Sequence, residues 1–361
     1  MAPAFRLRPD VASLPAYVPG GRPAAGATAY KLSSNENPFP PLPGVLAAVS
    51  DAAADLNRYP DMYATDLVEA LGERLGVGAE RVVVGNGSVG VLETLLTAAC
   101  VPGDEVVHAW RTFEAYPIAV QVAGARSVTV PLRADGRHDL PAMAAAITER
   151  TRAVLLCSPN NPTGPALREA EVRELLAQVP REVLVVLDEA YVEFVRDPDV
   201  VDGLALLRDH KNVVLLRTFS KAYGLAGLRV GYALARPRLI RGLRSASTPF
   251  GVNALAQVAA LASLRAEAAL LERVELVVAE RTRVVAALRD QGWDVPDAQG
   301  NFIWLPLAHR ALAFAQESAA EGALVRAFAG DGVRVSIGEH DANDTFLRIA
   351  ATGRERTALL R

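Results

Sequence analysis

Lysine is scarce in this sequence. Lys31, Lys211 and Lys221 are the three lysines among 38 basic residues, and all the others are arginines. A chain this rich in arginine could fill most surface positions with either cation, so each lysine is a candidate for chemistry that a guanidinium cannot perform. Forming an imine is such chemistry, because arginine is not deprotonated in a protein.

Cysteine, long apolar runs and excess positive charge are also missing. Two cysteines, Cys100 and Cys157, exclude a disulfide-rich scaffold. No apolar run approaches the ~18 residues of a membrane span, and residues 1–10 lack the apolar core of a signal peptide. The formal net charge of -3 argues against nucleic acid or an anionic membrane as a partner. We therefore expect a cytoplasmic enzyme that acts on small molecules.

Length and periodicity divide the chain into parts. A length of 361 residues corresponds to about two domains. A helical pattern over residues 266–292 and strand-like runs over 301–305 and 332–338 indicate a mixed C-terminal region. The predicted parts are an arm rich in proline and glycine over residues 1–45, a large domain over 46–248 and a small α+β domain over 249–361.

Short runs that are apolar at nearly every position recur through the large domain. They are Arg81–Val84, Glu105–Trp110, Ala153–Cys157, Val183–Leu187 and Asn212–Leu216. Such runs predict strands that are covered on both faces, in a mostly parallel sheet flanked by helices. The expected fold class is α/β. Because ligands of such sheets bind beyond the carboxyl ends of the strands, the residues after each run are the first candidates for a site.

The first run is followed by a glycine-rich segment, Gly85–Gly90, which leads into the helical pattern of Val91–Leu96. Free backbone N–H groups and the helix dipole at such a point form an anion cradle, so we expect phosphate binding there. The residues predicted to form it are Gly87, Ser88 and Val89. An ordinary glycine turn is the alternative.

The same glycine pattern also raises the possibility of a nicotinamide-dependent dehydrogenase. A ribose-binding acid should then close the second strand, about 20 residues further on. Asp104 and Glu105 instead open that strand, which ends in Trp110. The dehydrogenase interpretation also leaves the residues after the other runs without a role.

The residues after the later runs suggest one cofactor. Asp188 directly follows a buried run, where an unpaired carboxylate is costly and a cationic partner such as a pyridinium nitrogen is expected. Lys221 could form an imine on the same ring. Further candidates are Asn161 and Tyr191 as donors to a ring oxygen, Phe113 as a stacking partner, and Ser220 and Arg229 at a phosphate. Each has an ordinary structural explanation alone, but together they fit pyridoxal phosphate.

Six segments carry a resemblance that spans nearly the whole chain: Ser33–Pro38, Asn57–Asp61, Ser158–Gly164, Asp188–Tyr191, Arg217–Arg229 and Gly332–Gly338. With these motifs the chain resembles the fold type I pyridoxal-phosphate aminotransferases, in the group that contains histidinol-phosphate aminotransferase. The resemblance implies that Lys221 holds the cofactor as a Schiff base, that Asp188 faces the pyridine nitrogen, and that the remaining candidates take the ring oxygen and phosphate roles given above.

The resemblance also implies partners beyond the cofactor. Tyr59 would reach the phosphate of the neighbouring subunit's cofactor, which makes a homodimer the functional unit. Arg334 would bind the substrate carboxylate through its planar guanidinium. Asn35 and Tyr17 are further substrate-binding candidates, and no metal site is expected.

Substrate choice depends on the segment Trp110–Pro117. Histidinol-phosphate enzymes of this group usually have proline where this chain has Arg111, and the departure resembles the aromatic amino acid aminotransferase branch. We therefore expect the transfer of an amino group between an aromatic amino acid, phenylalanine or tyrosine, and a 2-oxo acid, 2-oxoglutarate. Histidinol phosphate remains the alternative substrate. Decarboxylation of a phosphorylated threonine is a less favoured reaction, and a pure binding protein would leave Lys221 without a role.

Overall fold

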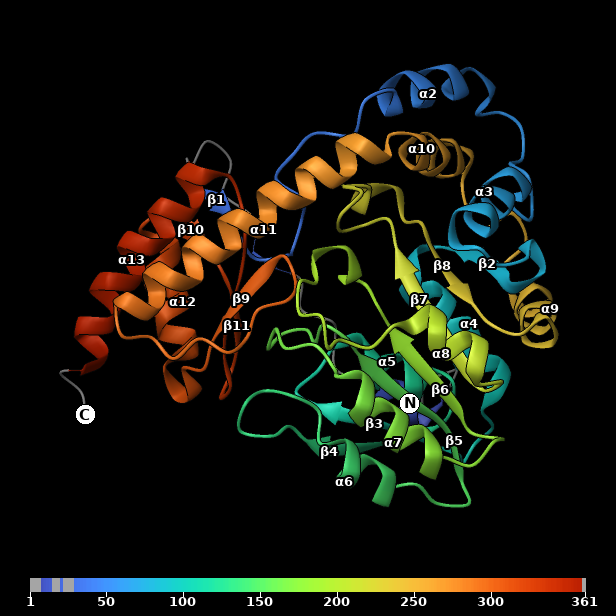
Figure 1. Cartoon of the computed structure of the whole chain (residues 1–361), viewed down its shortest axis with the longest axis horizontal. Coiled ribbons are helices and arrows are strands. Elements are labelled where there is room, and N and C mark those ends of the chain that lie inside the picture. The colour runs from blue at the N-terminus through green and yellow to red at the C-terminus, as the bar shows by residue number, and fades with distance from the viewer. Residues whose placement is uncertain (1–7, 15–19, 22–28, 359–361) are drawn as a thin grey trace, which may run out of the picture.

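The computed structural model describes residues 8–14, 20–21 and 29–358. Its centre is a seven-stranded sheet in the order β2-β8-β7-β6-β5-β3-β4, in which β8 alone runs antiparallel to its neighbours (Figure 1). The strands are β2 (Val82–Gly85), β3 (Glu105–Trp110), β4 (Arg126–Pro131), β5 (Thr151–Cys157), β6 (Leu184–Asp188), β7 (Val213–Thr218) and β8 (Gly231–Leu234). The predicted α/β class and the five expected strands are confirmed, while β4 and β8 are additional.

The sheet separates two apolar cores, which explains why its central strands are apolar at every position. In β5, Val154 and Leu156 belong to one core, whereas Leu155 and Cys157 belong to the other. One face is covered by α4 (Gly87–Ala99), α5 (Ala115–Val122) and α9 (Pro237–Ala246). The other is covered by α6 (Leu140–Ala145), α7 (Glu169–Gln178) and α8 (Gly203–Asp209). The large sheet is therefore the middle layer of three.

A smaller antiparallel sheet lies in the C-terminal part of the chain, in the order β11-β12-β9. Its strands are β9 (Phe302–Leu305), β11 (Arg326–Phe328) and β12 (Gly332–Ser336). Helices α11 (Glu267–Asp290) and α12 (Ala311–Ala320) contact it, and α13 (His340–Ala358) packs on both helices. Helix α11 runs from beside α10 to this small sheet (Figure 1). It confirms the helix expected over 266–292, and Gly292 follows it with a positive φ of 85°.

Segments distant in the chain join the two regions. Strand β1 (Tyr30–Lys31) pairs in parallel with β10 (Ala323–Leu324), and α10 (Ala254–Arg265) packs on α2 (Val45–Ala52) and α3 (Thr65–Leu75). The remaining helices are α1 (Pro9–Ala12) and the 3₁₀ turns Ala53–Asp55, Ala79–Arg81, Val192–Phe194, Ala226–Leu228 and Ala308–Arg310. The division into arm, large domain and small domain stays a prediction.

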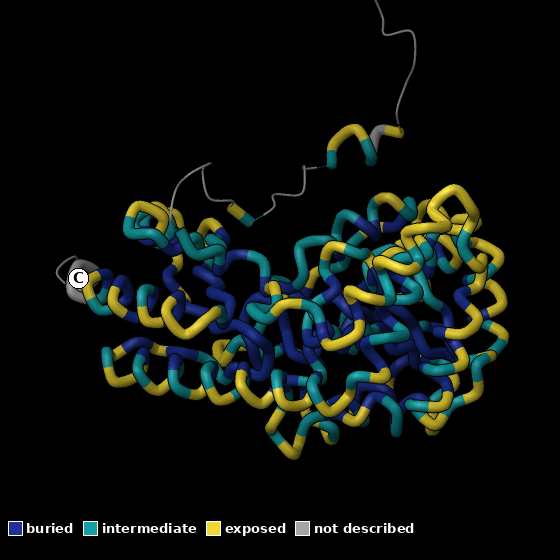
Figure 2. Tube along the Cα trace, turned by 90° about the horizontal axis from the view of Figure 1, so that it is seen from above, coloured by how far each residue is buried: buried dark blue, intermediate teal, exposed yellow. Residues whose placement is uncertain are grey.

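Burial follows these layers. Figure 2 shows buried segments running through the interior of both regions, with exposed segments at the outer turns and helix faces. No single helix in the described part of the chain has the length and apolar composition needed to cross a bilayer, although α10 and α11 pass that test as a pair bent by 83°.

Candidate active site

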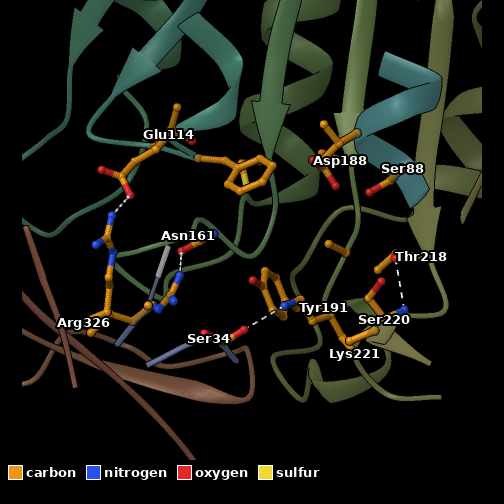
Figure 3. A pocket seen from close by; sticks show the side chains of 18 of the residues that line it. Ser34, Ser88, Glu114, Asn161, Asp188, Tyr191, Thr218, Ser220, Lys221 and Arg326 are labelled. Atoms are coloured by element: carbon orange, nitrogen blue, oxygen red, sulfur yellow. Dashed lines mark hydrogen bonds and ion pairs between the residues drawn. The ribbon is translucent and has the colours of Figure 1, made fainter. Parts of the chain in front are cut away.

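A cavity of about 190 Å³ lies beyond the carboxyl ends of the central strands (Figure 3). Strands β5, β6 and β7 bring their last residues to one side of it, and β11 and β12 of the small sheet contribute residues to the other. Ten of the residues predicted from the sequence line this cavity: Ser88, Val89, Phe113, Asn161, Asp188, Tyr191, Ser220, Lys221, Arg229 and Arg334. The fold therefore brings candidates from six segments to one place.

Lys221 follows the end of β7 and turns its amine toward the N-terminal segment. Its Nζ donates hydrogen bonds to the backbone carbonyl oxygens of Ser34 and Asn35, both at 3.2 Å. Burial, followed by the positive charge of Arg334, lowers the pKa of the Lys221 amine to about 7. A large share of this amine is therefore neutral near pH 7 and can act as a nucleophile.

Asp188 is the last residue of β6 and lies buried on the cavity wall. Its Oδ2 accepts a hydrogen bond from the Tyr116 hydroxyl at 2.8 Å. Its Oδ1 is buried and has no hydrogen-bond partner among the described residues. Burial raises the pKa of the carboxyl to about 6, although the bond from Tyr116 acts in the opposite direction. A buried carboxylate with one unsatisfied oxygen fits a protonated ring nitrogen as its partner.

The glycine segment after β2 forms a cradle with Arg229. Gly87 begins α4 with φ of 74°, and a Cβ at this position would lie 2.6 Å from Nη2 of Arg229. Nη1 of Arg229 lies 3.5 Å from the Ser220 hydroxyl. A guanidinium, a hydroxyl and the N-terminus of a 13-residue helix meet there. The donor set fits a phosphate group.

Asn35 lies behind the cavity wall and orients Tyr191. The fully buried Asn35 side chain donates from Nδ2 to the Tyr191 hydroxyl at 3.0 Å and accepts at Oδ1 from Ser336 Oγ at 3.0 Å. A phenol that accepts a bond from an amide keeps its own proton to donate. Tyr191 can therefore donate into the cavity, and a direct contact of Asn35 with substrate stays a prediction.

Arg334 lies on β12 and is 8% exposed. Its Nη1 donates to Oδ1 of Asn161 at 2.6 Å, and its Nη2 donates to the carbonyl oxygen of Ser33 at 2.8 Å. The first bond fixes the Asn161 amide with its oxygen toward the guanidinium, so that its NH₂ group is left as a donor for another partner. Arg334 thus positions Asn161 while presenting a cation to the cavity.

Besides Asn35, the predicted residues Gly87 and Tyr59 do not line the cavity. Gly87 supports the cradle without lining the cavity. Tyr59 lies outside the cavity, is 82% exposed and stacks on Phe250 with 4.6 Å between ring centroids. Tyr17 lies outside the described residues. The role of Tyr59 at a neighbouring subunit's cofactor stays a prediction.

The residues of the site that the sequence interpretation missed include Tyr116, Glu114, Arg326 and Phe328. Arg326 lies directly opposite Arg334 in the β11–β12 pairing and donates from Nη2 to Glu114 at 2.7 Å. The pairing register was the signal that could have found Arg326, but β11 is three residues long and has no apolar run to reveal it.

The glycine pattern does not occupy a dinucleotide-binding position. In a Rossmann domain the glycine-rich turn follows a central strand, next to the point where the strand order reverses. Here β2 is an edge strand and pairs only with the antiparallel β8. The dehydrogenase alternative is therefore not supported.

A mostly parallel sheet with a lysine and a carboxylate at adjacent strand ends is the architecture of the fold type I transferases. The sequence profile of the aminotransferase class I and II family matches residues 27–358. The chain belongs to this family.

Individual relatives agree with this assignment. The chain is 57% identical to an aromatic amino acid aminotransferase of Streptomyces avermitilis over 346 residues, which cover 95% of this chain and 96% of the relative. It is 56% identical to an aromatic amino acid aminotransferase of Thermobifida fusca, with 96% of each chain covered. Among solved structures, the histidinol-phosphate aminotransferase of Sinorhizobium meliloti in complex with pyridoxal-5'-phosphate is similar with a TM-score of 0.87, 28% identity and 99% of each chain covered.

Proposed function

We propose that this chain is a pyridoxal-phosphate-dependent aminotransferase that passes an amino group between phenylalanine or tyrosine and 2-oxoglutarate. The observation that carries the proposal is the placement of Lys221, Asp188 and the cradle of Gly87 and Arg229 around one cavity. Pyridoxal phosphate, when bound, supplies an electron sink for the α-carbon of the substrate.

Each part of the cofactor has a matching group in this chain. Asp188 Oδ1 would accept from the ring nitrogen, and the hydroxyl of Tyr191 with the amide of Asn161 would donate to the ring oxygen. Phe113 lines the cavity where it could pack on the ring face. The phosphate would be held at the start of α4 by Ser88, Val89, Ser220 and Arg229.

The reaction needs a base and an orienting cation, and this chain has both. The neutral Nζ of Lys221 would hold the cofactor and would move the proton at the α-carbon of the substrate. The Arg334 guanidinium binds the α-carboxylate of the substrate as a planar pair. Because Asn161 and Arg334 share a hydrogen bond of 2.6 Å, this contact would couple binding of the cofactor to binding of the carboxylate.

The far end of the cavity supports an aromatic substrate. Phe328 offers an apolar ring face there, and the guanidinium of Arg326 is paired with Glu114. The curated relatives at 50–57% identity are named aromatic amino acid aminotransferases. Histidinol phosphate is the second candidate, because Arg326 and Arg334 on one hairpin could hold a dianion and because a structural neighbour carries that activity in its name.

We also propose a cytoplasmic homodimer as the working form. The stacked rings of Tyr59 and Phe250 are exposed, and Arg229 of the phosphate cradle is exposed as well. A second copy covering this face would bury the aromatic pair and close the cradle. Cys100 and Cys157 are free, buried thiols, which suits a reducing compartment.

Competition kinetics test the substrate assignment. Phenylalanine and histidinol phosphate are supplied together as amino donors with 2-oxoglutarate, and both products are quantified. We expect a kcat/KM for phenylalanine that is about tenfold higher or more, because the distal end of the cavity has the ring of Phe328 and a guanidinium already paired with a carboxylate. A tenfold preference for histidinol phosphate would overturn the aromatic assignment and leave the cofactor chemistry standing.

A further inference from the structure

An ion pair lies at the end of the cavity away from the phosphate cradle. In Figure 3, Arg326 and Glu114 are joined on the side opposite Ser88, Thr218 and Ser220. The two atoms, Arg326 Nη2 and Glu114 Oε2, are 2.7 Å apart, and the side chains are 12% and 27% exposed. Both residues line the cavity, so the pair faces the part of a substrate farthest from the cofactor.

Glu114 has a second cation within reach. Nη1 of Arg111 lies 3.8 Å from Glu114 Oε1. Arg111 is held in place by Asp331, with Nε and Nη2 at 2.8 Å and 2.5 Å from Oδ2, and its guanidinium lies 4.4 Å from the centre of the Trp110 ring. Arg111 does not line the cavity. Glu114 therefore stands between a guanidinium inside the cavity and a fixed one outside it.

The position of Glu114 matters because phenylalanine and 2-oxoglutarate make opposite electrostatic demands on the end of the cavity farthest from the cofactor. An uncharged aromatic side chain displaces water from the Arg326 guanidinium without replacing its hydrogen bonds, so that cation needs another partner. A second carboxylate needs the same guanidinium free, and a neighbouring Glu114 carboxylate without a cation would repel it.

We propose that Glu114 is the specificity-determining residue that lets one cavity accept both substrates. Glu114 neutralises Arg326 when the distal group is an aromatic ring. When the distal group is a carboxylate, Arg326 pairs with the substrate and Glu114 pairs with Arg111. This inference rests on the proposed function, because it takes Arg334 as the site of the α-carboxylate and places the distal group at Arg326.

Equilibrium binding of two unreactive acids tests this proposal. Glutarate carries a distal carboxylate and 3-phenylpropionate a distal ring, and neither has an amino group to react. Their dissociation constants are measured by titration of the holoenzyme of wild type and of Glu114→Gln. We expect the preference for glutarate over 3-phenylpropionate to rise about tenfold in Glu114→Gln, because Arg326 loses its competing partner.

A matched control and a second substitution separate this role from a structural one. Glu169→Gln removes an arginine-paired carboxylate of similar exposure on α7 and should leave the preference unchanged. Arg111→Gln should weaken glutarate selectively in the wild-type background and have no selective effect in the Glu114→Gln background.

The outcomes distinguish this proposal from the proposed function. An unchanged preference in Glu114→Gln, or an equal loss for both acids, would overturn the role of Glu114 even if phenylalanine is a good amino donor. If phenylalanine is not transaminated but the preference shifts as expected, the substrate assignment fails and the role of Glu114 in selecting the distal group stands.

Discussion

At the scale of single residues, the chemistry depends on two groups, Lys221 and Asp188, and burial shifts the pKa of each toward neutral pH. Burial lowers the pKa of Lys221 to about 7 and raises that of Asp188 to about 6. In each case the charged form is the one disfavoured by loss of water. A cationic ring nitrogen beside Asp188 would reverse the shift in the pKa of this carboxyl, because it would stabilise the charged form.

The shifted pKa of Lys221 predicts how the apoenzyme takes up pyridoxal phosphate. Covalent attachment requires the neutral amine, whose fraction rises as the pH passes upward through about 7. The attachment rate should therefore increase between about pH 6 and 8 and then level off. Stopped-flow absorbance after mixing apoenzyme with the cofactor measures it. A rate that still climbs tenfold per pH unit above pH 9 would contradict the shift.

A matched variant tests whether Lys221 is the residue that attaches the cofactor. Lys221→Arg keeps a cation of similar length but has no amine that can be deprotonated, so it should bind the cofactor without any covalent absorbance change. Covalent uptake by Lys221→Arg at the wild-type rate would assign the attachment to another group.

The site residues that were predicted from the sequence either directly follow an apolar run or lie in a recognisable motif. Asp188 and Lys221 are of this kind. Tyr116 and Arg326 were missed because their roles depend on distances across the fold. Tyr116 reaches Asp188 from α5, which connects β3 and β4, and Arg326 reaches Glu114 across 212 positions of sequence.

At the scale of elements, α4 and the turn before β8 meet with almost no space between them. The left-handed backbone of Gly87 has a φ of 74°, which costs a residue with a Cβ about 1 kcal/mol. A Cβ there would also lie 2.6 Å from Nη2 of Arg229. The glycine is therefore needed both for its conformation and for the close approach of the guanidinium.

Gly87→Ala should consequently weaken the phosphate cradle. We expect the dissociation constant for pyridoxal phosphate to rise about tenfold or more, since Arg229 must move away from the start of α4. Equilibrium titration of the apoenzyme measures the change. Gly227→Ala is the control, because Gly227 has open space around its Cβ position and lies two residues before Arg229. Equal affinities for wild type and Gly87→Ala would show that the cradle does not hold the phosphate.

Elements with a clear apolar pattern could be predicted from the sequence, and elements with a weak pattern could not. The five predicted strands are apolar at nearly every position, so their sequences show what they are. Strand β4 is at the edge of the sheet and contains Arg126 and Thr129, and β8 (GYAL) has no β-branched residue and begins with glycine. Local sequence therefore gives only a weak strand signal in both.

At the scale of the whole molecule, the site exists only where the two sheets meet. Lys221 and Asp188 come from the large sheet, and Arg334 comes from the small one. The N-terminal segment ties them together: the backbone N–H of Asn35 donates to Ser336 at 2.7 Å, and its side chain donates to Tyr191. Periodicity cannot predict this docking, because it depends on contacts between residues about 300 positions apart.

The central claim is that Lys221 is the point at which pyridoxal phosphate attaches to this chain. The scarcity of lysine makes a direct measurement possible, since the cofactor can be fixed by borohydride reduction of the holoenzyme and its position read by peptide mass spectrometry. We predict a phosphopyridoxyl group on Lys221 and none on Lys31 or Lys211. Label on either of these lysines with Lys221 unmodified, or no label on any of the three, would contradict the account.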